Sequence, residues 1–392
     1  MLIIKIFFWI SVILLIYNYL LYPLILLIIH YFSKNYKCRK PNIVFSPNVS
    51  IIIAAHNEDL VISDKLASII NGDYPLEKIE ILIGSDNSTD NTNAILSEWA
   101  EKYSFIKPYF FTQRQGKIAI LNQLIPKANN EILILTDANM IFSPKNIIEL
   151  VIYFSNPKIG FVDSRRIINI NESKDGITLP EQKYISIESK IKEYEGCIWG
   201  KSMGSFSGCY AMRKDLFSPI PENKLITDDL YICLNILKNN FWGIYARDAV
   251  VYEKTTADMK IEYNRKIRIA AGAIQNLFIF SSILLNLNAL SFCFFSHKVL
   301  RWLGPFFLII IILLSIIIAT TGNWLYILLS SIIVLSILIA IIDRFILYPR
   351  NKTLKLFRFI THFYLANLAT LMGWIRVIKG TKNSIWTPPP RA

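Results

Sequence analysis

Three clusters of polar residues each follow a short apolar run in the first half of the chain. Residues 56–58 (HNE) follow the first run, residues 85–90 (SDNSTD) follow the second, and residues 136–139 (TDAN) follow a later one. Short apolar runs bounded by polar residues are typical of buried strands. In an open α/β sheet, ligands bind at the carboxyl ends of the strands. We therefore expect the three clusters to meet in one crevice.

The cluster at residues 136–139 has the composition of a divalent-cation site. Asp137 and Asn139 carry side-chain oxygens and flank a small residue, so on an extended chain both point the same way. Such oxygens suit Mg²⁺ or Mn²⁺, which also hold substrate phosphates and stabilise negative charge as a nucleoside diphosphate leaves. Asp and Asn also form turns at strand ends, so the motif alone leaves both interpretations open.

A pair of carboxylates, Asp228 and Asp229, stands at an expected helix start. Helix capping and compensation of the helix dipole explain Asp228 well. The second carboxylate is less necessary for capping. Asp229 is therefore a candidate general base that takes a proton from an attacking hydroxyl.

Two basic stretches have cations suited to a pyrophosphate. Lys117 follows Gln115 and Gly116 just before an expected helix, while Arg265 and Arg268 lie in the helical stretch RKIR at residues 265–268. A solvated helix face is the alternative explanation for both stretches.

The elements that must position these residues alternate between strand and helix. The apolar patterns predict strands at residues 49–54, 79–84 and 131–136, and helices at residues 60–70, 92–103 and 118–125. This order predicts an α/β fold with a parallel sheet covered by helices. The nearly continuous apolar character of the first and third strands is typical of strands buried on both faces.

The two ends of the chain have the composition of a membrane protein. The 392 residues are 53% hydrophobic, and the excess lies at the ends, whereas the middle carries charges throughout. Residues 6–32 exceed the roughly 20 apolar residues needed to cross a bilayer. A basic cluster at residues 34–40 follows this run and only Lys5 precedes it, so we expect the N-terminus outside and the middle of the chain in the cytosol.

The C-terminal third contains four further apolar segments. Residues 274–295 have interspersed polar residues and predict a surface-lying amphipathic helix. Residues 303–320 and 324–342 predict a transmembrane hairpin. Residues 357–378 contain polar side chains and precede more basic residues, which favours an interfacial or re-entrant path with the tail in the cytosol.

The net charge of +13 fits the positive-inside pattern of a membrane protein. No helix-turn-helix, zinc-finger or aromatic–basic pattern indicates a nucleic-acid partner. The five cysteines show no metal-binding spacing, and their scatter predicts buried thiols in a reducing compartment.

Taken together and in order, these motifs resemble the family 2 glycosyltransferases, specifically the membrane-integrated bacterial branch related to cellulose, hyaluronan and poly-N-acetylglucosamine synthases. The resemblance runs from residue 49 to about residue 275 and continues less specifically to the C-terminus. Residues 49–58 are similar to the family's first strand and "PAYNE" turn, residues 85–90 to "SDGSTD", and residues 116–122 to "GKxxALN". Residues 207–213 are similar to its acceptor-side "GAxxAxR" segment. The resemblance implies a GT-A fold with a mostly parallel sheet.

The resemblance also implies roles for individual residues. His56, Glu58, Asp86 and Lys117 would contact the nucleotide-sugar, with Glu58 near the base or ribose of a uridine. Asp137 would hold Mg²⁺ or Mn²⁺, helped by Asn139, which replaces the second Asp of the family's DxD motif. The "ED" element matches residues 228–229, which makes Asp229 the expected catalytic base and Asp228 a supporting carboxylate.

The chain departs from the family at the QxxRW motif of the processive synthases. Arg268 retains the diphosphate-binding arginine, but Arg265 replaces Gln and Ile269 replaces Trp. Polymerisation through a channel is therefore in doubt, whereas transfer of one or a few sugars remains reasonable.

We therefore expect an inverting transfer from a nucleotide-sugar, most simply a UDP-sugar, to a lipid-linked or oligosaccharide acceptor at the cell inner membrane. The expected regions are a membrane anchor (residues 1–40), a cytosolic GT-A domain (41–270), an interfacial helix (271–298) and a C-terminal membrane region (299–392). The alternatives are a non-catalytic nucleotide-binding scaffold of a polysaccharide assembly system and a transporter. The absence of charged residues within 303–320 argues against a transport pathway made by this chain alone. Export or assembly subunits are not identified by these motifs.

Overall fold

The computed structural model describes residues 1–33, 37–169, 178–205, 207–222, 224, 226–254, 259–347 and 354–380. The chain divides into two compact units, which are described one at a time. The unit we call the sheet unit comprises Phe32–Asn171, Ser189–Thr256 and Thr381–Ala392. The unit we call the helical unit comprises Met1–Tyr31, Glu172–Glu188 and Ala257–Gly380.

The sheet unit is built on one mixed sheet, which has eight strands in the described part of the chain. Their order across the sheet is β3-β2-β1-β4-β7-β6-β8-β5. The bounds are β1 Val49–Ala55, β2 Ile79–Asp86, β3 Ile106–Phe111, β4 Ile132–Asp137, β5 Met140–Phe142, β6 Ile159–Asn169, β7 Cys209–Arg213 and β8 Trp242–Lys254.

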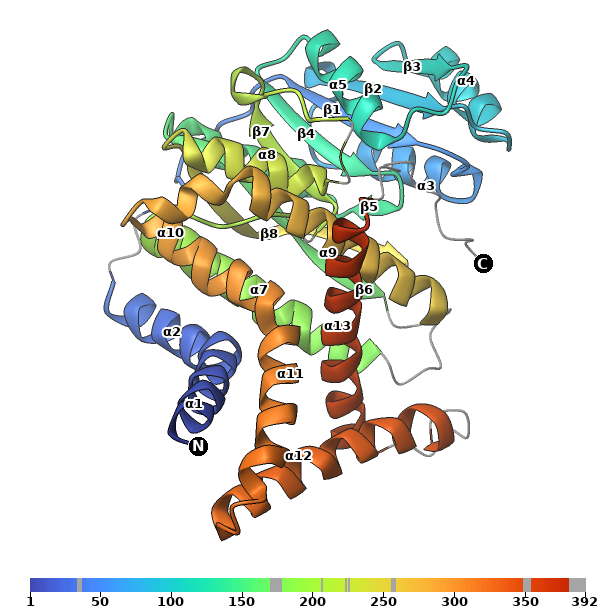
Figure 1. Cartoon of the computed structure of the whole chain (residues 1–392). Helices are drawn as coiled ribbons and strands as arrows, with labels where there is room; N and C mark the ends of the chain where they lie inside the picture. The colour runs from blue at the N-terminus through green and yellow to red at the C-terminus, as the bar shows by residue number, and fades with distance from the viewer. Residues whose placement is uncertain are drawn as a thin grey trace. The chain divides into compact units, whose positions relative to one another are not determined.

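The first half of this sheet is parallel, as predicted. β1 pairs in parallel with β2 on one side and with β4 on the other, and β2 pairs in parallel with β3. The predicted helices are also present, as α3 (Asp59–Ile70), α4 (Thr92–Lys102) and α5 (Lys117–Leu124). Figure 1 shows α3, α4 and α5 beside these strands. The α/β prediction is confirmed for this part of the chain.

The second half of the sheet is mostly antiparallel and was not predicted. β7 runs antiparallel to both β4 and β6, β5 runs antiparallel to β8, and β6 and β8 pair in parallel. These pairings join segments that are far apart in the chain. Local hydrophobic periodicity carries no information about which distant segment a strand joins.

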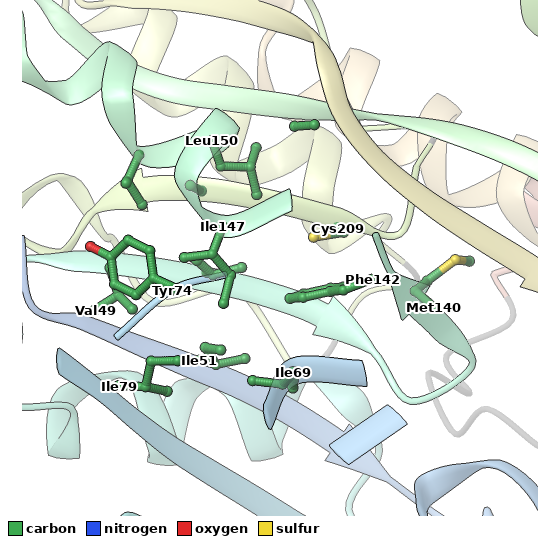
Figure 2. Packing of buried hydrophobic residues seen from close by; sticks show 14 of the residues in the cluster. Val49, Ile51, Ile69, Tyr74, Ile79, Met140, Phe142, Ile147, Leu150 and Cys209 are labelled. Atoms are coloured by element: carbon green, nitrogen blue, oxygen red, sulfur yellow. The ribbon is translucent and has the colours of Figure 1, made fainter. Parts of the chain in front are cut away.

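The core of the sheet unit lies between the sheet and its helices. The strands β1 and β2 contribute Ile51 and Ile79, α3 contributes Ile69, and α6 (Asn146–Val151) contributes Ile147 and Leu150; all are buried. Figure 2 shows these side chains in one common interior. This packing holds the strand ends in fixed positions, which a site at the sheet edge requires.

The other helices of the sheet unit lie in the connections between its strands. They are the second part of α7 (Thr178–Trp199), α8 (Asp228–Lys238), and the short 3-10 helices η2 (Leu76–Lys78), η3 (Ile125–Lys127), η4 (Ile152–Ser155) and η5 (Lys214–Leu216).

A disulfide joins Cys38, in the segment before β1, to Cys197 near the end of α7. The neighbouring Lys37 Nζ donates a hydrogen bond to the Ile198 carbonyl oxygen at 2.7 Å. The prediction of buried thiols is wrong for this pair, because the fold brings two cysteines 159 residues apart into bonding distance. It is confirmed for Cys209, Cys233 and Cys293, which are free and buried. Disulfides persist mainly in oxidising compartments and in hyperthermophile cytosols.

The helical unit contains three helical runs that are long and apolar enough to cross a membrane, counted over the described residues. They are Leu2–Phe32, Ala289–Ala319 and Trp324–Leu347. Its elements are α1 Leu2–Ile16, η1 Tyr17–Leu21, α2 Tyr22–Phe32, the first part of α7, α9 Met259–Ile279, η6 Ser281–Leu285, α10 Ala289–Cys293, η7 Phe294–Val299, α11 Leu300–Ala319, α12 Trp324–Ile342, η8 Asp343–Leu347 and α13 Lys355–Ile378.

The apolar segment at residues 274–295 differs from the single amphipathic helix that was predicted. α9 ends at Ile279, the 3-10 helix η6 follows, and α10 then begins a helical run that continues to Ala319. Asn288 caps α10 by accepting a hydrogen bond from the Ser291 backbone N–H, which starts the new helix at that point. The predicted interfacial placement of residues 271–298 stays a prediction.

The last predicted segment is α13, one continuous helix that packs against α9 in the helical unit (Figure 1). The two helices approach closely at Gly373, where an added Cβ would lie 2.8 Å from the Ala270 Cβ. The cytosolic tail that was predicted after α13 lies outside the described residues.

Two glutamates on α7 anchor the helices of this unit through ion pairs. Glu188, which is buried, receives His297 Nε2 at 2.7 Å, Lys298 Nζ at 2.6 Å and a close contact from Arg301. Burial alone would raise the pKa of Glu188, but these cations hold it well below its ordinary value. A buried carboxylate is stable only when it is paired in this way.

Glu181, two turns earlier on α7, makes the second anchor. Its Oε2 lies 2.5 Å from Lys266 Nζ on α9 and 2.9 Å from His362 Nε2 on α13. Burial would raise the pKa of Glu181, but the His362 hydrogen bond and the Lys266 charge lower it below its ordinary range. The spacing of seven residues places both glutamates on one side of α7.

The disulfide predicts a measurable stabilisation of the sheet unit. Cross-linking residues 159 apart removes chain entropy from the unfolded state worth about 5 kcal/mol. We expect Cys38→Ser to lower the free energy of unfolding by up to that amount, as measured by denaturant unfolding of the purified protein. The double variant with Cys197→Ser should behave like the single variant, since either change opens the same bond. A wild-type unfolding midpoint that does not respond to reductant would contradict the pairing.

Candidate active site

The carboxyl ends of β1, β2 and β4 lie side by side on one edge of the sheet. In the parallel registers, Ala54 of β1 pairs with Asp137 of β4, and Ala55 pairs with Ser85 of β2. The three polar clusters that follow these strands therefore lie at neighbouring positions along that edge, as the strand order predicted.

The turn after β1 is tied to the turn after β2. His56 Nδ1 lies 2.7 Å from the Asp86 carbonyl oxygen, and the Glu58 backbone N–H donates to Thr92 Oγ1 at 2.8 Å. Asn57 adopts a φ of 52°, in the left-handed region, and its Oδ1 accepts a hydrogen bond from the Thr89 backbone N–H at 2.8 Å. Burial lowers the pKa of His56, against the opposing effect of its hydrogen bond to Asp86.

The carboxylate of Asp86 positions the loop before α5. Its Oδ1 accepts the Gln115 backbone N–H at 2.7 Å, and its Oδ2 accepts the Gly116 backbone N–H at 2.8 Å. Gly116 has a φ of +89°, which a residue with a Cβ rarely adopts. Asp86 thus fixes the backbone that leads into Lys117, while its direct contact with a nucleotide stays a prediction.

Lys117 lies between two carboxylates. Its Nζ is 2.8 Å from Asp137 Oδ1 and 2.9 Å from Asp228 Oδ2. Burial by itself lowers the pKa of Lys117, but Asp137 and Asp228 raise it above its ordinary value. As the first residue of α5, the ammonium stands at the positive end of a helix dipole, which disfavours a cation. The two carboxylates offset that penalty. We call Lys117, Asp137, Asp228 and Asp229 the acidic centre.

Asp228 and Asp229 are the first two residues of α8. Thr227 is the N-cap residue, and the Asp228 carboxylate pairs with Lys117. Capping therefore does not account for Asp228. Burial and the neighbouring Asp228 raise the pKa of Asp229 to about 7, against the opposing charge of Lys117 and a hydrogen bond from the Leu230 backbone N–H. A carboxylate with a pKa near neutrality is suited to general-base chemistry.

A tyrosine hydroxyl lies among these carboxylates. Tyr210 is 3% exposed, and its hydroxyl has no hydrogen-bond partner within the described part of the chain. Burial raises the pKa of Tyr210 well above its ordinary value, and Asp228 and Asp229 raise it further. The hydroxyl is therefore protonated and able to donate to a ligand oxygen.

The carboxylates of the acidic centre are suited to binding a divalent cation. No group of three or more His, Cys, Asp or Glu ligands occurs among the described residues. Asp137 and Asp228 nevertheless converge on the Lys117 ammonium, so a cation is favoured at that point. Mg²⁺ is commonly held by one or two carboxylates together with substrate phosphates. The donor set therefore fits a metal that binds with a nucleotide.

The expected alignment of Asp137 and Asn139 rests on an extended chain, and that premise is wrong. Residues 138–139 form a turn between β4 and β5, because the chain reverses there to begin the next strand. Strand geometry therefore does not make the two side chains parallel. Asn139 is half-buried in this turn, and its role as a metal ligand stays a prediction.

Gly208, just before β7, permits the close approach of Asp137. The Gly208 carbonyl oxygen accepts the Asp137 backbone N–H at 2.8 Å. Gly208 has a φ of +66°, and an added Cβ would lie 2.9 Å from Asp137 Oδ2 and 2.8 Å from the Met140 methyl carbon. Only glycine fits this position without moving the carboxylate.

Sequence reasoning missed Lys65, a fully buried lysine on α3. Its Nζ donates to Thr136 Oγ1 at 2.9 Å and to the Met140 carbonyl oxygen at 2.5 Å, which tie together the two ends of the turn that carries Asp137. Burial lowers the pKa of Lys65 to about 7, and the neighbouring Cys209 and Asp137 oppose this effect. A lysine on the apolar stripe of a helix, between Ile62 and Ile69, is the sequence signal that could have identified it.

A second missed group supports the segment before Gly208. Asp163, on β6, is buried and accepts Lys192 Nζ at 2.5 Å and the Ser207 hydroxyl at 2.7 Å. The segment 207–213, which was predicted to face the acceptor, is therefore hydrogen-bonded through Ser207 to a buried ion pair.

Arg265 and Arg268 lie on α9 of the helical unit. Arg265 Nε pairs with Glu262 Oε2 of the same helix at 2.9 Å. The contacts of the acidic centre given above all involve residues of the sheet unit. The pyrophosphate contacts expected of both arginines stay predictions.

The family matches cover the part of the chain that contains these motifs. Residues 50–220 match the model of glycosyl transferase family 2, and residues 202–347 match that of glycosyl transferase family group 2. A probable glycosyltransferase, YdaM, of Bacillus subtilis is 26% identical over 62% of this chain and 60% of its own length. A beta-monoglucosyldiacylglycerol synthase of Nostoc is 30% identical over 58% of this chain and 49% of its own length.

Two further proteins extend the comparison. A poly-beta-1,6-N-acetyl-D-glucosamine synthase of Staphylococcus epidermidis is 28% identical over 47% of this chain and 44% of its own length. The chain thus spans about half the length of the curated relatives that it matches. The structure of a mannosyltransferase from Pyrobaculum calidifontis, in complex with GDP-Man and Mn²⁺, superposes with a TM-score of 0.68. It covers 93% of this chain and 99% of its own at 19% identity.

The structural likeness establishes the fold, and the two family matches together extend from the first strand of the sheet to the end of the third membrane-compatible helix. The chain therefore contains glycosyl transferase family 2 domains with a GT-A fold, and it has apolar helices at both ends.

Proposed function

We propose that this chain is an inverting, metal-dependent enzyme that transfers a sugar from a nucleotide-sugar, in the first instance a UDP-sugar, to a membrane-associated acceptor. The observation that carries this proposal is the acidic centre at the carboxyl ends of parallel strands. There the ammonium of Lys117 joins Asp137 to Asp228, and Asp229 has a pKa near neutrality.

In the proposed reaction, the base of the donor lies near His56, Glu58 and Asp86. A divalent cation held by Asp137, with Asn139, would neutralise the pyrophosphate as it leaves. Asp229 takes the proton from the acceptor hydroxyl for in-line attack at the anomeric carbon, and the neighbouring Asp228 raises the pKa of Asp229 and so strengthens it as a base. Arg268, with Arg265, is proposed to neutralise the departing diphosphate. Stabilisation of developing negative charge is often the largest single catalytic contribution.

The proposed acceptor is a lipid-linked or oligosaccharide molecule in cell-surface polysaccharide or glycolipid synthesis. Support comes from the three membrane-compatible helices and from relatives named as a glycolipid synthase and a polysaccharide synthase. The basic cluster after the first helix supports placing the sheet unit on the cytosolic face of the inner membrane. Protease accessibility of the sheet unit in inverted membrane vesicles tests this sidedness.

The replacement of the processive Trp by Ile269 supports addition of one or a few sugars. The length of the product on a ladder of acceptor oligosaccharides tests this point.

The experiment that tests the proposed function is a donor screen. Purified protein in membranes is incubated with UDP-, GDP- and TDP-sugars, with and without Mg²⁺ or Mn²⁺, and release of nucleoside diphosphate is measured. Metal-dependent release from one donor class is expected. Nucleotide binding without release from any donor would support a non-catalytic scaffold instead.

Asp229→Asn should lower the transfer rate by at least about 10²-fold, because general-base catalysis typically contributes 10²- to 10⁴-fold. Donor affinity, measured by isothermal titration with the nucleoside diphosphate, should change little. Asp215→Asn, which alters an exposed aspartate of the same unit, is the matched control and should retain activity. Near-normal turnover by Asp229→Asn would show that the base is another group.

The pKa of Asp229 also predicts a pH profile. The carboxylate accepts a proton only when it is ionised, so kcat/KM should rise with pH through about 7 and then level off. Asp229→Asn should remove this acidic limb from any residual activity.

The same group links folding to pH. The folded-state pKa of Asp229 lies above its ordinary value of 3.8, so the folded state binds the proton more tightly. The resulting stability is present at low pH and is lost as the pH rises from about 4 to about 7. Unfolding measured across this range in the wild type and in Asp229→Asn checks the sign, and a wild-type profile no different from that of the variant would contradict it.

A further inference from the structure

Lys117 occupies the point in the acidic centre where a divalent cation would be most strongly attracted. Its Nζ lies within 2.9 Å of one oxygen from each of two carboxylates, Asp137 and Asp228. The side chains of Lys117, Asp137 and Asp228 are 31%, 39% and 16% exposed, so water screens their interactions in part. The ammonium therefore neutralises charge that a metal would otherwise neutralise.

An ammonium and a divalent cation compete for the same carboxylate oxygen. Two cations within contact distance of Asp137 Oδ1 would repel each other, because water screens their charges only in part at this half-exposed site. A metal that binds at Asp137 must therefore displace Lys117 or share the site with it at a large energetic penalty. In the absence of another anion, displacement leaves the lysine against the positive end of the α5 dipole.

A nucleoside diphosphate would change this balance in two ways. Its pyrophosphate oxygens would offer the Lys117 ammonium a new anionic partner, and they would add ligands to a cation at Asp137. The loop that precedes Lys117 is also bonded to the proposed nucleotide site. Asp86 accepts hydrogen bonds from the backbone N–H groups of Gln115 and Gly116. A nucleotide that contacts this loop would therefore be able to change the position of Lys117.

We propose that Lys117 is an internal counter-cation that holds the cation position of the empty enzyme, so that a divalent metal binds tightly only together with a nucleoside diphosphate. This inference rests on the proposed function, since it takes the acidic centre to be the donor and metal site. The competition makes metal and nucleotide binding positively coupled, and linkage requires the coupling to be reciprocal. It also keeps the acidic centre from being loaded by metal alone.

The test measures Mn²⁺ binding by electron paramagnetic resonance of the full chain in detergent, with and without UDP or GDP. Mn²⁺ with nucleotide but no protein is measured in parallel to subtract their complex in solution. For the wild type, we expect nucleotide to tighten Mn²⁺ binding by about 10-fold or more, within the usual range of coupling between sites.

Lys117→Met should bind Mn²⁺ alone about 10-fold more tightly than the wild type, because the competing charge is gone and the carboxylates of Asp137 and Asp228 remain. The coupling to nucleotide should largely disappear in this variant. Lys117→Arg keeps the positive charge and should keep the weak binding of Mn²⁺ alone. Lys145→Met, at an exposed lysine before α6, removes the same charge elsewhere in the sheet unit and should bind Mn²⁺ as the wild type does.

The outcomes separate this inference from the proposed function. Unchanged or weaker binding of Mn²⁺ alone by Lys117→Met, with native circular dichroism, overturns the counter-cation role even if sugar transfer is found. Equal tightening in Lys117→Met and Lys117→Arg also overturns it, because charge would not be the cause. Absence of Mn²⁺ binding in every variant, with or without nucleotide, overturns both this inference and the metal dependence of the proposed reaction.

Discussion

The parallel pairing of β1 with β2 and β4 is the constraint on which the site depends. Parallel strands must end on the same edge, and the registers set Asp137 beside Ala54 and Ser85 beside Ala55. Every polar turn that follows these strands is then held within reach of the next by the buried core beneath. The cross-links between the turns, such as the contact of His56 with the Asp86 carbonyl oxygen, are consequences of that pairing.

Near this edge of the sheet, lysine side chains lie close to the carboxylates and turns of the site. The acidic centre contains three carboxylates, and Lys117 neutralises part of their charge by pairing with Asp137 and Asp228. Lys65 lies buried behind the turn that carries Asp137, and the buried Lys192–Asp163 pair lies beneath the segment before Gly208. The two buried charges of Lys192 and Asp163 are tolerated because they pair with each other, whereas Lys65 is satisfied by hydrogen bonds to Thr136 and Met140. Burial and the neighbouring Asp228 raise the pKa of Asp229 to about 7, and the charge of Lys117 opposes them.

The helical unit also contains buried charges that are paired. Its apolar helices satisfy the requirement for membrane crossing by composition, yet the residues that join its helices include buried ion pairs. Glu181 and Glu188 on α7 contact the basic side chains of α9, α13, η7 and α11. In the sheet unit, the Cys38–Cys197 disulfide adds a covalent link between the segment before β1 and the end of α7.

The sequence by itself determined the features that depend on local pattern. Local sequence predicted the first strands and helices, the apolar ends and the order of the motifs. These features depend on periodicity, composition and turn residues, which are properties of short stretches of chain. The tertiary structure alone decided which distant groups meet. The antiparallel half of the sheet, the disulfide, the glutamates of α7 and the burial of Lys65 depend on pairings across tens to hundreds of residues. The same holds for Lys117, whose contacts with Asp137 and Asp228 exist only once α5, β4 and α8 have packed together. Sequence spacing does not encode such contacts, because they arise from the packing of whole elements.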